Sequence, residues 1–239
     1  MTILVLDDQG LTAEALATRI QQELAVDVKV LHRVADLNRE FILRSNFEAA
    51  VVDLSFRGET MHGLDALFAI HRHSPQTHLV VHTVGDHYLE RMLRDAWEVL
   101  PLAAVVAKGP SASTITKVLQ HVRATGSAPM DPVLRPLLPA VRWRRSPESF
   151  YRLVPHLGHA KMWQAMFGEP DGATYATLAG TAGVKVNALK NYRADVVSEL
   201  AAHHLPQAST RDMQEFAKRC RPFLRPALLA HGLKLIGID

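Results

Sequence analysis

Chemically active side chains follow apolar runs at four places in the first half of the sequence. They are Asp7 and Asp8, Asp53, Thr83 and Lys108. Three carboxylates at one place would repel one another, and a bound divalent cation would relieve that repulsion. Mg²⁺ prefers a few carboxylates together with water and phosphate oxygens, and a hydroxyl and an ammonium group could contact the remaining oxygens of a phosphoryl group. If the fold brings these residues together, they predict Mg²⁺ binding and phosphoryl transfer.

The elements that would position these residues alternate between two patterns. Short runs rich in Val, Ile and Leu, typical of strands buried on both faces, are each followed by apolar residues at helical spacing. The runs cover 2–6, 28–31, 49–54, 78–82 and 103–107, and the helical patterns cover 11–24, 36–44, 63–73, 86–100 and 113–124. Right-handed crossovers between them predict an α/β fold, a (βα)5 doubly wound parallel sheet. Residues at the carboxyl ends of its strands would meet at one edge.

Each of these residues has a simpler explanation when it is taken alone. An Asp after a strand is more often a helix cap than a ligand, and a single lysine is usually a solvated charge. The five residues are informative as a set because each lies at the end of a predicted strand, and their order along the chain fits one shared site. A phosphatase-type hydrolase is an alternative on the same fold, but it would want a second acid two residues after Asp53, where Ser55 stands.

The composition is that of an ordinary globular protein, with 239 residues, 48% of them hydrophobic and 21% charged. The longest apolar run, 99–107, is far shorter than the roughly 20 residues of a membrane helix. Two acids follow the apolar start, where a signal peptide would continue. The single cysteine, Cys220, excludes an internal disulfide and a cysteine-based zinc site. We therefore expect a cytoplasmic protein without a membrane partner.

Charge and proline content divide the chain. Residues 1–125 carry 12 Lys and Arg against 15 Asp and Glu, a net charge of −3, and residues 126–239 carry a net charge of +6. Frequent prolines and a basic run at 142–145 follow the last α/β pattern, and proline at that density prevents long helices. We predict an α/β domain over 1–125, a linker over 126–149 and a helical domain over 150–239, whose charge suits a polyanion.

The segment 174–200 has the pattern of a helix-turn-helix. Small apolar residues precede Gly183, which can supply the positive φ of a tight turn, and a second apolar stripe follows. The stripe consists of Leu189, Tyr192, Val196 and Val197, and the exposed side or the start of the second helix carries Lys185, Asn187, Lys190, Asn191 and Arg193. Lys and Arg can neutralise phosphates, and Asn and Arg can read base edges, so the segment predicts DNA binding. A helical hairpin without that function is the alternative.

Further helices flank this hairpin. We expect a scaffold helix over 159–167 that packs before it, and one or two added helices over 210–230 that break at Pro222 and Pro226. The core residues of the scaffold helix would be Met162, Trp163, Met166 and Phe167. The added helices would serve packing or dimer contacts.

The 13 histidines suggest a test for a transition-metal site. The neighbouring pairs are His71 and His73, His78 and His82, and His203 and His204. The first and last pairs face apart, and the middle pair would share a strand face but has no third ligand. These patterns predict no transition-metal site.

Residues 1–125 resemble the receiver domain of bacterial two-component response regulators. The resemblance rests on the stretches Leu4-Val5-Leu6-Asp7-Asp8, Val51-Val52-Asp53-Leu54, Val80-Val81-His82-Thr83 and Val106-Ala107-Lys108. It implies that Asp53 accepts a phosphoryl group from a sensor histidine kinase. The implied Mg²⁺ ligands are Asp7, Asp8, Asp53 and the backbone carbonyl of Ser55. Thr83 and Lys108 would contact the phosphoryl oxygens, and no enzymatic turnover is expected beyond slow self-dephosphorylation.

Some positions depart from the receiver pattern. Val105 stands where an aromatic switch residue usually lies, Val84 follows the threonine in place of a small residue, and the loop 53–63 is longer and lacks a usual proline. Val105 and the altered loop favour an alternative, an atypical receiver that is regulated by a protein or a small ligand at the same site without phosphorylation. The complete Asp, Thr and Lys set opposes that alternative.

The segment 151–205 resembles the helix-turn-helix of response-regulator effector domains of the LuxR/NarL type. Together, the two resemblances imply a DNA-binding transcription regulator that acts as a homodimer. Phosphorylation of Asp53 would shift a pre-existing equilibrium of the receiver and change dimerisation or the release of the basic domain. A protein-binding or RNA-binding output of the helical half is the alternative.

Overall fold

The computed structural model describes residues 2–109 and 113–233 and divides the chain into two compact units. Residues up to Arg144 form the sheet unit, and residues from Arg145 form the helical unit. The segment predicted as a linker therefore divides between the two units. No helix in the described ranges is both long enough and apolar enough to cross a membrane.

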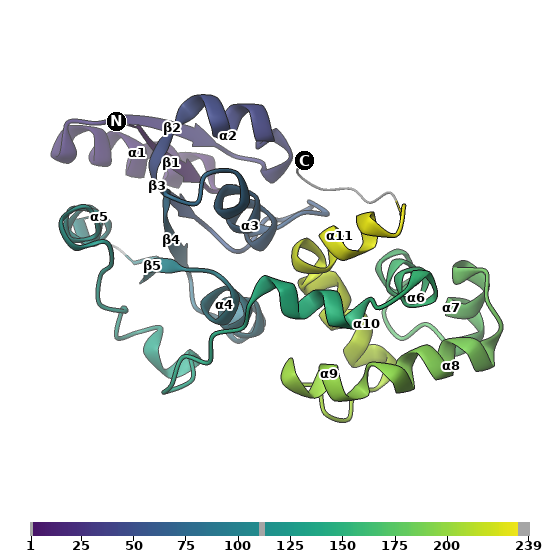
Figure 1. Cartoon of the computed structure of the whole chain (residues 1–239). Helices are drawn as coiled ribbons and strands as arrows, with labels where there is room; N and C mark the ends of the chain where they lie inside the picture. Colours follow the sequence, from purple (N-terminus) through teal and green to yellow (C-terminus); the bar gives the residue numbers. More distant parts are fainter. Residues whose placement is uncertain (1, 110–112, 234–239) are drawn as a thin grey trace. The chain divides into compact units, whose positions relative to one another are not determined.

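The sheet unit is built on five parallel strands in the order β2-β1-β3-β4-β5 (Figure 1). The strands are β1 (Thr2–Leu6), β2 (Asp27–Leu31), β3 (Phe47–Val52), β4 (His78–Thr83) and β5 (Leu102–Ala107). Each neighbouring pair is parallel, as in Val5 opposite Val51 and Val51 opposite Val80. The order reverses after β2, so the crossovers place helices on both faces. The predicted fold class is confirmed.

Among the described residues, five α-helices and the short 3₁₀ helix η1 (Val34–Asp36) accompany this sheet. The α-helices are α1 (Gly10–Leu24), α2 (Arg39–Ser45), α3 (Gly63–His73), α4 (His87–Val99) and α5 (Ser113–Thr125). Helices α1 and α5 contact each other, and α3 contacts both α2 and α4. Alternate side chains of a strand point to opposite faces. Val5, Val51 and Val106 accordingly join the core with α1 and α5.

Two strands differ from the prediction for identifiable reasons. Strand β3 starts at Phe47, two residues before the predicted run, because Phe47 is itself buried and pairs with Thr2 of β1. The intervening Glu48 pairs with Arg123 of α5 at 3.1 Å. Strand β2 is an edge strand and is not buried on both faces, since Asp27 and Lys29 are exposed. A charged edge strand discourages pairing with another sheet.

The opposite edge of the sheet is covered by residues 128–142, which we name the strap. The backbone N–H of Ala128 donates to Ala103, and that of Asp131 donates to Val105, at 2.8 and 3.1 Å. The carboxylate of Asp131 accepts from the N–H of Ala107 at 3.0 Å. The strap therefore supplies hydrogen-bond partners for backbone groups at the free edge of β5. It contains the short 3₁₀ helix η2 (Arg135–Leu137).

The far end of the strap is held by Arg142. Its guanidinium donates to the carbonyl oxygens of Trp97 and Leu100 at the end of α4 and lies 4.1 Å from the centroid of the Trp97 ring. Carbonyls at a helix C-terminus attract a cation. The Arg145 guanidinium, in the helical unit, is buried 2.7 Å from the Nδ1 atom of His203. Two members of the basic run thus have partners within the protein.

In the described residues of the helical unit, every regular element is a helix. The helices are the 3₁₀ helix η3 (Pro147–Leu153), α6 (Leu157–Gly168), α7 (Tyr175–Ala182), α8 (Val186–Asp195), α9 (Val197–Ala202), α10 (Thr210–Arg219) and α11 (Arg221–Ala230). Helix α6, the expected scaffold, contacts α7, α8, α10 and α11. Gly183 has φ 64° and ends α7, as its predicted role as a turn residue requires. The second helix of the pair ends at Asp195, and Val196 separates it from α9.

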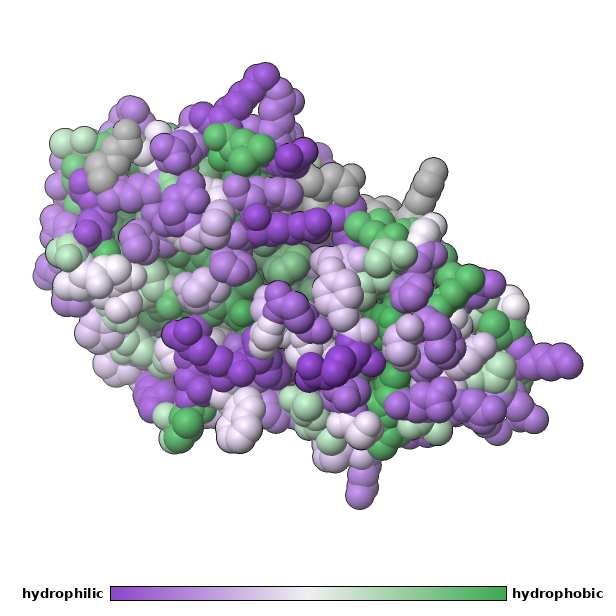
Figure 2. Space-filling view, viewed as in Figure 1, coloured by the Kyte–Doolittle hydropathy of each residue, from purple (hydrophilic) through white to green (hydrophobic). Residues whose placement is uncertain are grey.

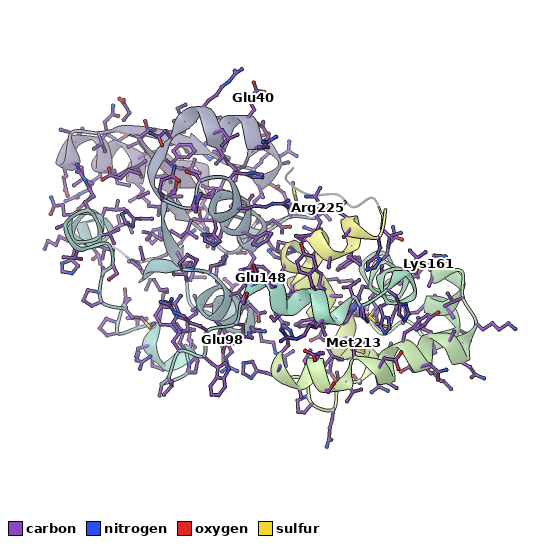
Figure 3. The ribbon with its side chains drawn as sticks, in the orientation of Figure 1. Glu40, Glu98, Glu148, Lys161, Met213 and Arg225 are labelled. Carbon is purple, nitrogen blue, oxygen red and sulfur yellow. The ribbon has the colours of Figure 1, made fainter. Side chains whose placement is uncertain are left out.

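Aromatic side chains from distant segments form the core of the helical unit. Trp163 of α6 is fully buried and donates from its indole nitrogen to the carbonyl of Leu153 at 2.7 Å. Phe150 of η3 lies 5.1 Å from Phe223 of α11, centroid to centroid. Met213 of α10 lies among these helices, whereas Glu40 of α2 points outward from the sheet unit (Figure 3). Hydrophilic residues spread over much of the face in view in Figure 2.

The C-terminal helices differ from the prediction at both prolines. The break between α10 and α11 falls at Cys220, because Pro222 lies in the first turn of α11, where a missing N–H costs nothing. Helix α11 continues past Pro226. In the scaffold helix, Met162, Trp163 and Met166 are buried as expected, while Phe167 is only partly buried.

Candidate functional site

The five residues singled out first lie at the carboxyl ends of the strands. Asp7 and Asp8 follow β1, Asp53 follows β3, Thr83 ends β4 and Lys108 follows β5. Backbone hydrogen bonds of the sheet continue beyond the strands and hold these residues in place. The N–H of Asp53 donates to Leu6 at 2.9 Å, and the N–H of Lys108 donates to Thr83 at 2.8 Å. The sheet topology thus brings together what the sequence separates by up to 101 positions.

Lys108 pairs with two buried carboxylates. Its Nζ atom lies 2.7 Å from Asp7 Oδ2 and 2.8 Å from Asp53 Oδ2, and both acids are almost completely shielded from solvent. The other Asp53 oxygen accepts from the N–H of Leu54 at 2.8 Å. Asp53 is therefore held in one orientation by fixed donors, as a nucleophile or an acceptor of a transferred group requires.

Burial and the ion pairs act against each other on the pKa values of this site. Burial raises the pKa of Asp53 above its ordinary value, although the hydrogen bond from Lys108 opposes the rise. Burial alone would lower the pKa of Lys108, but the hydrogen bonds from its ammonium to Asp53 and Asp7 outweigh burial and raise this pKa. Lys108 therefore stays charged wherever the carboxylates are ionised.

A third carboxylate gives the site an excess of negative charge. One oxygen each of Asp7, Asp8 and Asp53 lies within 4.8 Å of the other two, and Asp8 Oδ2 accepts from the N–H of Arg57 at 2.9 Å. Three carboxylates and one ammonium leave a charge of −2. This donor set fits Mg²⁺, which takes carboxylate oxygens and keeps waters. Ser55 follows in the β3–α3 loop, and its backbone N–H donates to Asp53; its carbonyl as a ligand stays a prediction.

Thr83 presents a hydroxyl without a partner. The residue is fully buried, and among the described residues no hydrogen-bond partner lies within reach of its Oγ1 atom. A buried hydroxyl without a hydrogen bond costs free energy. An oxygen of a bound phosphoryl group would supply the missing acceptor.

Gly63 lets the start of α3 approach Asp53 closely. A Cβ atom at this position would lie 2.0 Å from the carbonyl oxygen of Asp53 and 2.6 Å from the Cα atom of Leu54. Both neighbours are backbone atoms, which cannot turn away. Glycine is therefore required here by space, and the close approach fixes the loop that follows the acceptor.

The strap contacts the loop that leaves Thr83. Gly85 has φ 71°, and a Cβ atom on it would lie 2.3 Å from Cδ2 of Leu134 and 3.5 Å from Cδ1 of Leu137. Leu134 is fully buried. Two residues after the unpartnered hydroxyl, the chain therefore packs against the segment that precedes the helical unit in sequence.

Helix α8 presents most, but not all, of the predicted DNA-contacting residues. The exposed ones are Lys185, Asn187, Lys190 and Asn191. Lys190 Nζ lies 5.7 Å from the centroid of the Tyr175 ring of α7. Arg193 differs, because it is partly buried and its guanidinium donates to the carbonyl of Ala208. The structure therefore separates Arg193 from the exposed set and gives it an internal contact.

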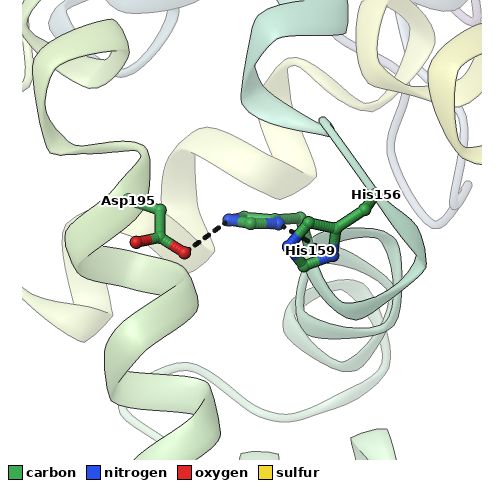
Figure 4. A group of neighbouring side chains, drawn as sticks. All are labelled: His156, His159 and Asp195. Carbon is green, nitrogen blue, oxygen red and sulfur yellow. Dashed lines mark hydrogen bonds and ion pairs between the residues drawn. The ribbon is translucent and has the colours of Figure 1, made fainter.

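A second polar cluster was missed by sequence reasoning. His156 and His159, at the start of α6, lie beside Asp195 at the end of α8, with one ligand atom of each residue within 4.8 Å of the others (Figure 4). The spacing of His156 and His159 along a helix is the only sequence signal. Asp195 lies 36 positions further along the chain, so only the packing of α8 on α6 reveals the group.

One solved structure is similar in fold to this chain over most of its length. RcsB from Salmonella enterica serovar Typhimurium, solved bound to a promoter in the presence of phosphomimetic BeF₃⁻, is similar over 92% of this chain and 98% of its own, with 15% identity and a TM-score of 0.50. A LuxR-family two-component response regulator from Aurantimonas is similar over 56% of this chain and 92% of its own, with 17% identity and a TM-score of 0.48. No family model and no curated protein matches the sequence. The fold is that of a receiver domain followed by a helix-turn-helix domain.

Proposed function

We propose that this chain is a DNA-binding response regulator whose Asp53 accepts a phosphoryl group from a sensor histidine kinase. The observation that carries the proposal is the contact of Lys108 with both Asp7 and Asp53, beside the unpartnered hydroxyl of Thr83. A site that held only structural ion pairs would not need a buried, unsatisfied hydroxyl. The cytoplasmic location and the homodimer stay predictions.

In the transfer step, a carboxylate oxygen of Asp53 forms a bond to phosphorus. The bond between phosphorus and the histidine nitrogen of the kinase breaks, and the nitrogen keeps the electron pair. The ammonium of Lys108 then pairs with a phosphoryl oxygen in place of the Asp53 oxygen, and the hydroxyl of Thr83 donates a hydrogen bond to another phosphoryl oxygen. Asp7, Asp8 and Asp53 would hold Mg²⁺, whose charge would offset that of the phosphoryl oxygens.

The strap offers a route for the signal. The movement of Thr83 toward a phosphoryl group would displace Val84 and Gly85, and Gly85 packs against Leu134 and Leu137. Val105, which stands where an aromatic switch residue is usual, is buried and its carbonyl accepts from Asp131 of the strap. We therefore place the coupling in the strap rather than in an aromatic side chain.

The output would be the binding of α8 in the major groove of DNA. Gly183 sets the turn between α7 and α8, and exposed Lys and Asn side chains cover the outer side of α8. Lysines contact phosphates, and asparagines can pair with base edges. The RcsB structure bound to a promoter is similar in fold, which supports the same output here.

The first experiment tests the acceptor. The full chain is incubated with acetyl phosphate and Mg²⁺, and the intact mass should increase by one phosphoryl group. Asp53→Asn should gain none, whereas Asp27→Asn, a matched change at an exposed position of β2, should be labelled like the wild type. Equal labelling of Asp53→Asn would refute the assignment.

The second experiment tests the output. A gel shift with genomic DNA fragments is run with and without beryllofluoride and Mg²⁺, and with competitor RNA. Phosphorylation control predicts that beryllofluoride changes the DNA affinity. DNA binding that ignores beryllofluoride would favour the atypical, ligand-regulated receiver, and loss of the complex to competitor RNA would favour an RNA-binding output.

A further inference from the structure

The cluster of His156, His159 and Asp195 contains a hydrogen-bonding conflict. His159 is almost completely buried; its Nδ1 atom lies 3.3 Å from Nδ1 of His156, and its Nε2 atom lies 3.5 Å from Oδ2 of Asp195 (Figure 4). His156 Nδ1 already accepts from the N–H of Gly158 at 3.1 Å, so it carries a lone pair. Both nitrogens of His159 therefore face acceptor atoms.

A neutral imidazole cannot satisfy both contacts, because only one of its nitrogens carries a proton. If Nδ1 of His159 is protonated, Nε2 faces the Asp195 carboxylate without a proton. If Nε2 is protonated, the two Nδ1 lone pairs face each other. The His159 ring also has a hydrogen bond to the backbone of Tyr192, which leaves the contact between the two Nδ1 atoms as the point of conflict. A proton on His159 or a metal ion between the two Nδ1 atoms would remove it.

The surroundings of His159 disfavour the proton. The His159 side chain is almost completely buried, whereas the carboxylate of Asp195 beside its Nε2 atom is more than half exposed. A protonated His159 would therefore be a buried charge whose acidic partner is largely solvated.

We propose that His156, His159 and Asp195 form a binding site for a divalent transition-metal ion of the zinc type. Tetrahedral zinc with Zn–N bonds of about 2.0–2.1 Å separates two imidazole nitrogens by about 3.3–3.4 Å, and the Nδ1 atoms of the two rings lie 3.3 Å apart. On binding the metal, His156 Nδ1 would give up the hydrogen bond that it accepts from the N–H of Gly158. Nε2–H of His159 would then donate to Asp195, the usual outer partner of a metal-bound histidine. Imidazole nitrogens select zinc, copper or nickel over Mg²⁺ and Ca²⁺.

The surroundings of the cluster restrain both rings. The Tyr192 ring of α8 lies 5.4 Å from the His156 ring and 5.1 Å from the His159 ring, centroid to centroid. A metal ion held here would connect the start of α6 to the end of α8 through His156, His159 and Asp195. Metal binding should consequently stabilise the helical unit.

The test measures metal binding directly. Full-length protein without a polyhistidine tag is stripped with a chelator, and ZnCl₂ is titrated by calorimetry at pH 7.5. We expect one equivalent to bind and the unfolding temperature to rise by roughly 5 °C at a hundredfold excess over Kd. CoCl₂ should give the visible absorption of a tetrahedral ion with nitrogen ligands.

Two exposed members of the cluster can be changed without touching the core. His156→Ala should weaken zinc binding at least tenfold, and Asp195→Asn should weaken it about tenfold as an outer partner. His121→Ala, at an exposed histidine of α5, is the matched control and should keep the affinity. Circular dichroism checks that each variant is folded.

Equal zinc affinity in the wild type and His156→Ala would overturn the proposal, because it would assign the binding to other histidines. The proposal would also be overturned if zinc did not bind at micromolar concentration and a nitrogen-15 spectrum showed His159 doubly protonated at pH 7.5. Loss of binding in His156→Ala with retention in Asp195→Asn would support a site of two histidines. None of these outcomes depends on the proposed phosphorylation or DNA binding.

Discussion

In the sheet unit, the chemical groups follow strands that are hydrogen-bonded to one another, whereas in the helical unit the polar cluster joins two helices that meet through side chains. Asp53 and Lys108 both extend the backbone ladder of the sheet, through Leu6 and Thr83. His159 and Asp195 lie on separate helices, and the ring of Tyr192 packs between their elements. The first arrangement leaves little freedom to the acceptor, and the second can adjust by rotation of a ring.

The two clusters also differ in how their charge is balanced. The three carboxylates beside β1 and β3 include an internal cation, Lys108, and still keep an excess of negative charge. The imidazole cluster has no ammonium or guanidinium group among its members. A site with an internal cation can exist without a ligand and exchange it, while in the imidazole cluster an added proton or metal ion would supply the positive charge. Reversible signalling suits the first, and structural binding suits the second.

The largest effect should come from two glycines that test this contrast directly. Gly63→Ala forces a Cβ atom against the backbone of Asp53, and we expect it to lower the free energy of unfolding by about 3 kcal/mol or more. Gly158→Ala meets the ring of Tyr192 at 2.4 Å, and because a ring can rotate we expect a loss of about 1 kcal/mol.

Urea unfolding of the full chain measures both changes. Gly10→Ala is the control, since the nearest atom to its added Cβ is 4.0 Å away, on His32, and its effect should stay within about 0.5 kcal/mol. If Gly63→Ala and Gly158→Ala lowered the free energy of unfolding equally, the backbone contacts of the sheet site and the side-chain contacts of the helical cluster would be equally rigid. That result would contradict the difference proposed between the two units.

The next effect concerns the strap. Leu134→Ala removes a fully buried side chain that packs on Gly85 and should cost about 3 kcal/mol. The adjacent Val133→Ala, at a side chain that is 68% exposed, should cost less than about 0.5 kcal/mol. Unfolding curves give both numbers. If the two variants were equally stable, the strap would be a detached linker and could not carry a signal from Thr83.

Much of the sheet unit could be predicted because its signals are local. Apolar runs and helical spacing predicted the bounds of β1 and α3 without error, and the parallel direction of the strands placed Asp7, Asp53 and Lys108 at one edge. The pairing of Lys108 with two acids then follows from topology. The charge of Glu48 interrupts the apolar pattern at the start of β3, and its partner Arg123 lies in a distant helix. The local pattern therefore does not predict where this strand begins.

The strap and the imidazole cluster depend on distant contacts. The prolines of 126–149 predict an irregular segment, but its binding to β5 rests on the fit of Asp131 and Leu134 to particular backbone groups. Similarly, the internal contact of Arg193 depends on the loop at Ala208, which no helical pattern locates. Packing between separate elements decides each of these outcomes.

A smaller effect is expected from pH. Burial lowers the pKa of His82 to about 4, with a further lowering by Lys108. The unfolded chain binds a proton at about pH 6.5, so stability that is present above this pH is lost as the pH falls toward 4. The loss should be roughly 2 kcal/mol by about pH 5. His82→Gln cannot titrate, and the difference between the wild-type and variant stability curves should change over this range. Parallel curves would contradict the burial of a neutral His82.

The smallest effect distinguishes two cations of α8 and rests on the proposed DNA binding. Lys190 is exposed, whereas the guanidinium of Arg193 is bonded to the carbonyl of Ala208. If Lys190 contacts a phosphate, Lys190→Ala should weaken DNA binding about equally on all sequences and lower the salt slope by about 1. Its free energy of unfolding should not change. Arg193→Ala should instead lower that free energy by about 0.5 kcal/mol, because an internal hydrogen bond is lost.

Binding isotherms at two salt concentrations, with urea unfolding of the same samples, separate the two effects. Arg193→Ala should leave the salt slope unchanged, since its charge is directed toward the protein and not toward a phosphate. A lower slope for Arg193→Ala at unchanged stability would mean that its contact with Ala208 opens on DNA. In that case the Arg193 side chain of α8 would change its contact when the helix binds DNA. Such an adjustment by a side chain is what the comparison of the two units predicts for the helical unit, and it is not expected for the sheet unit.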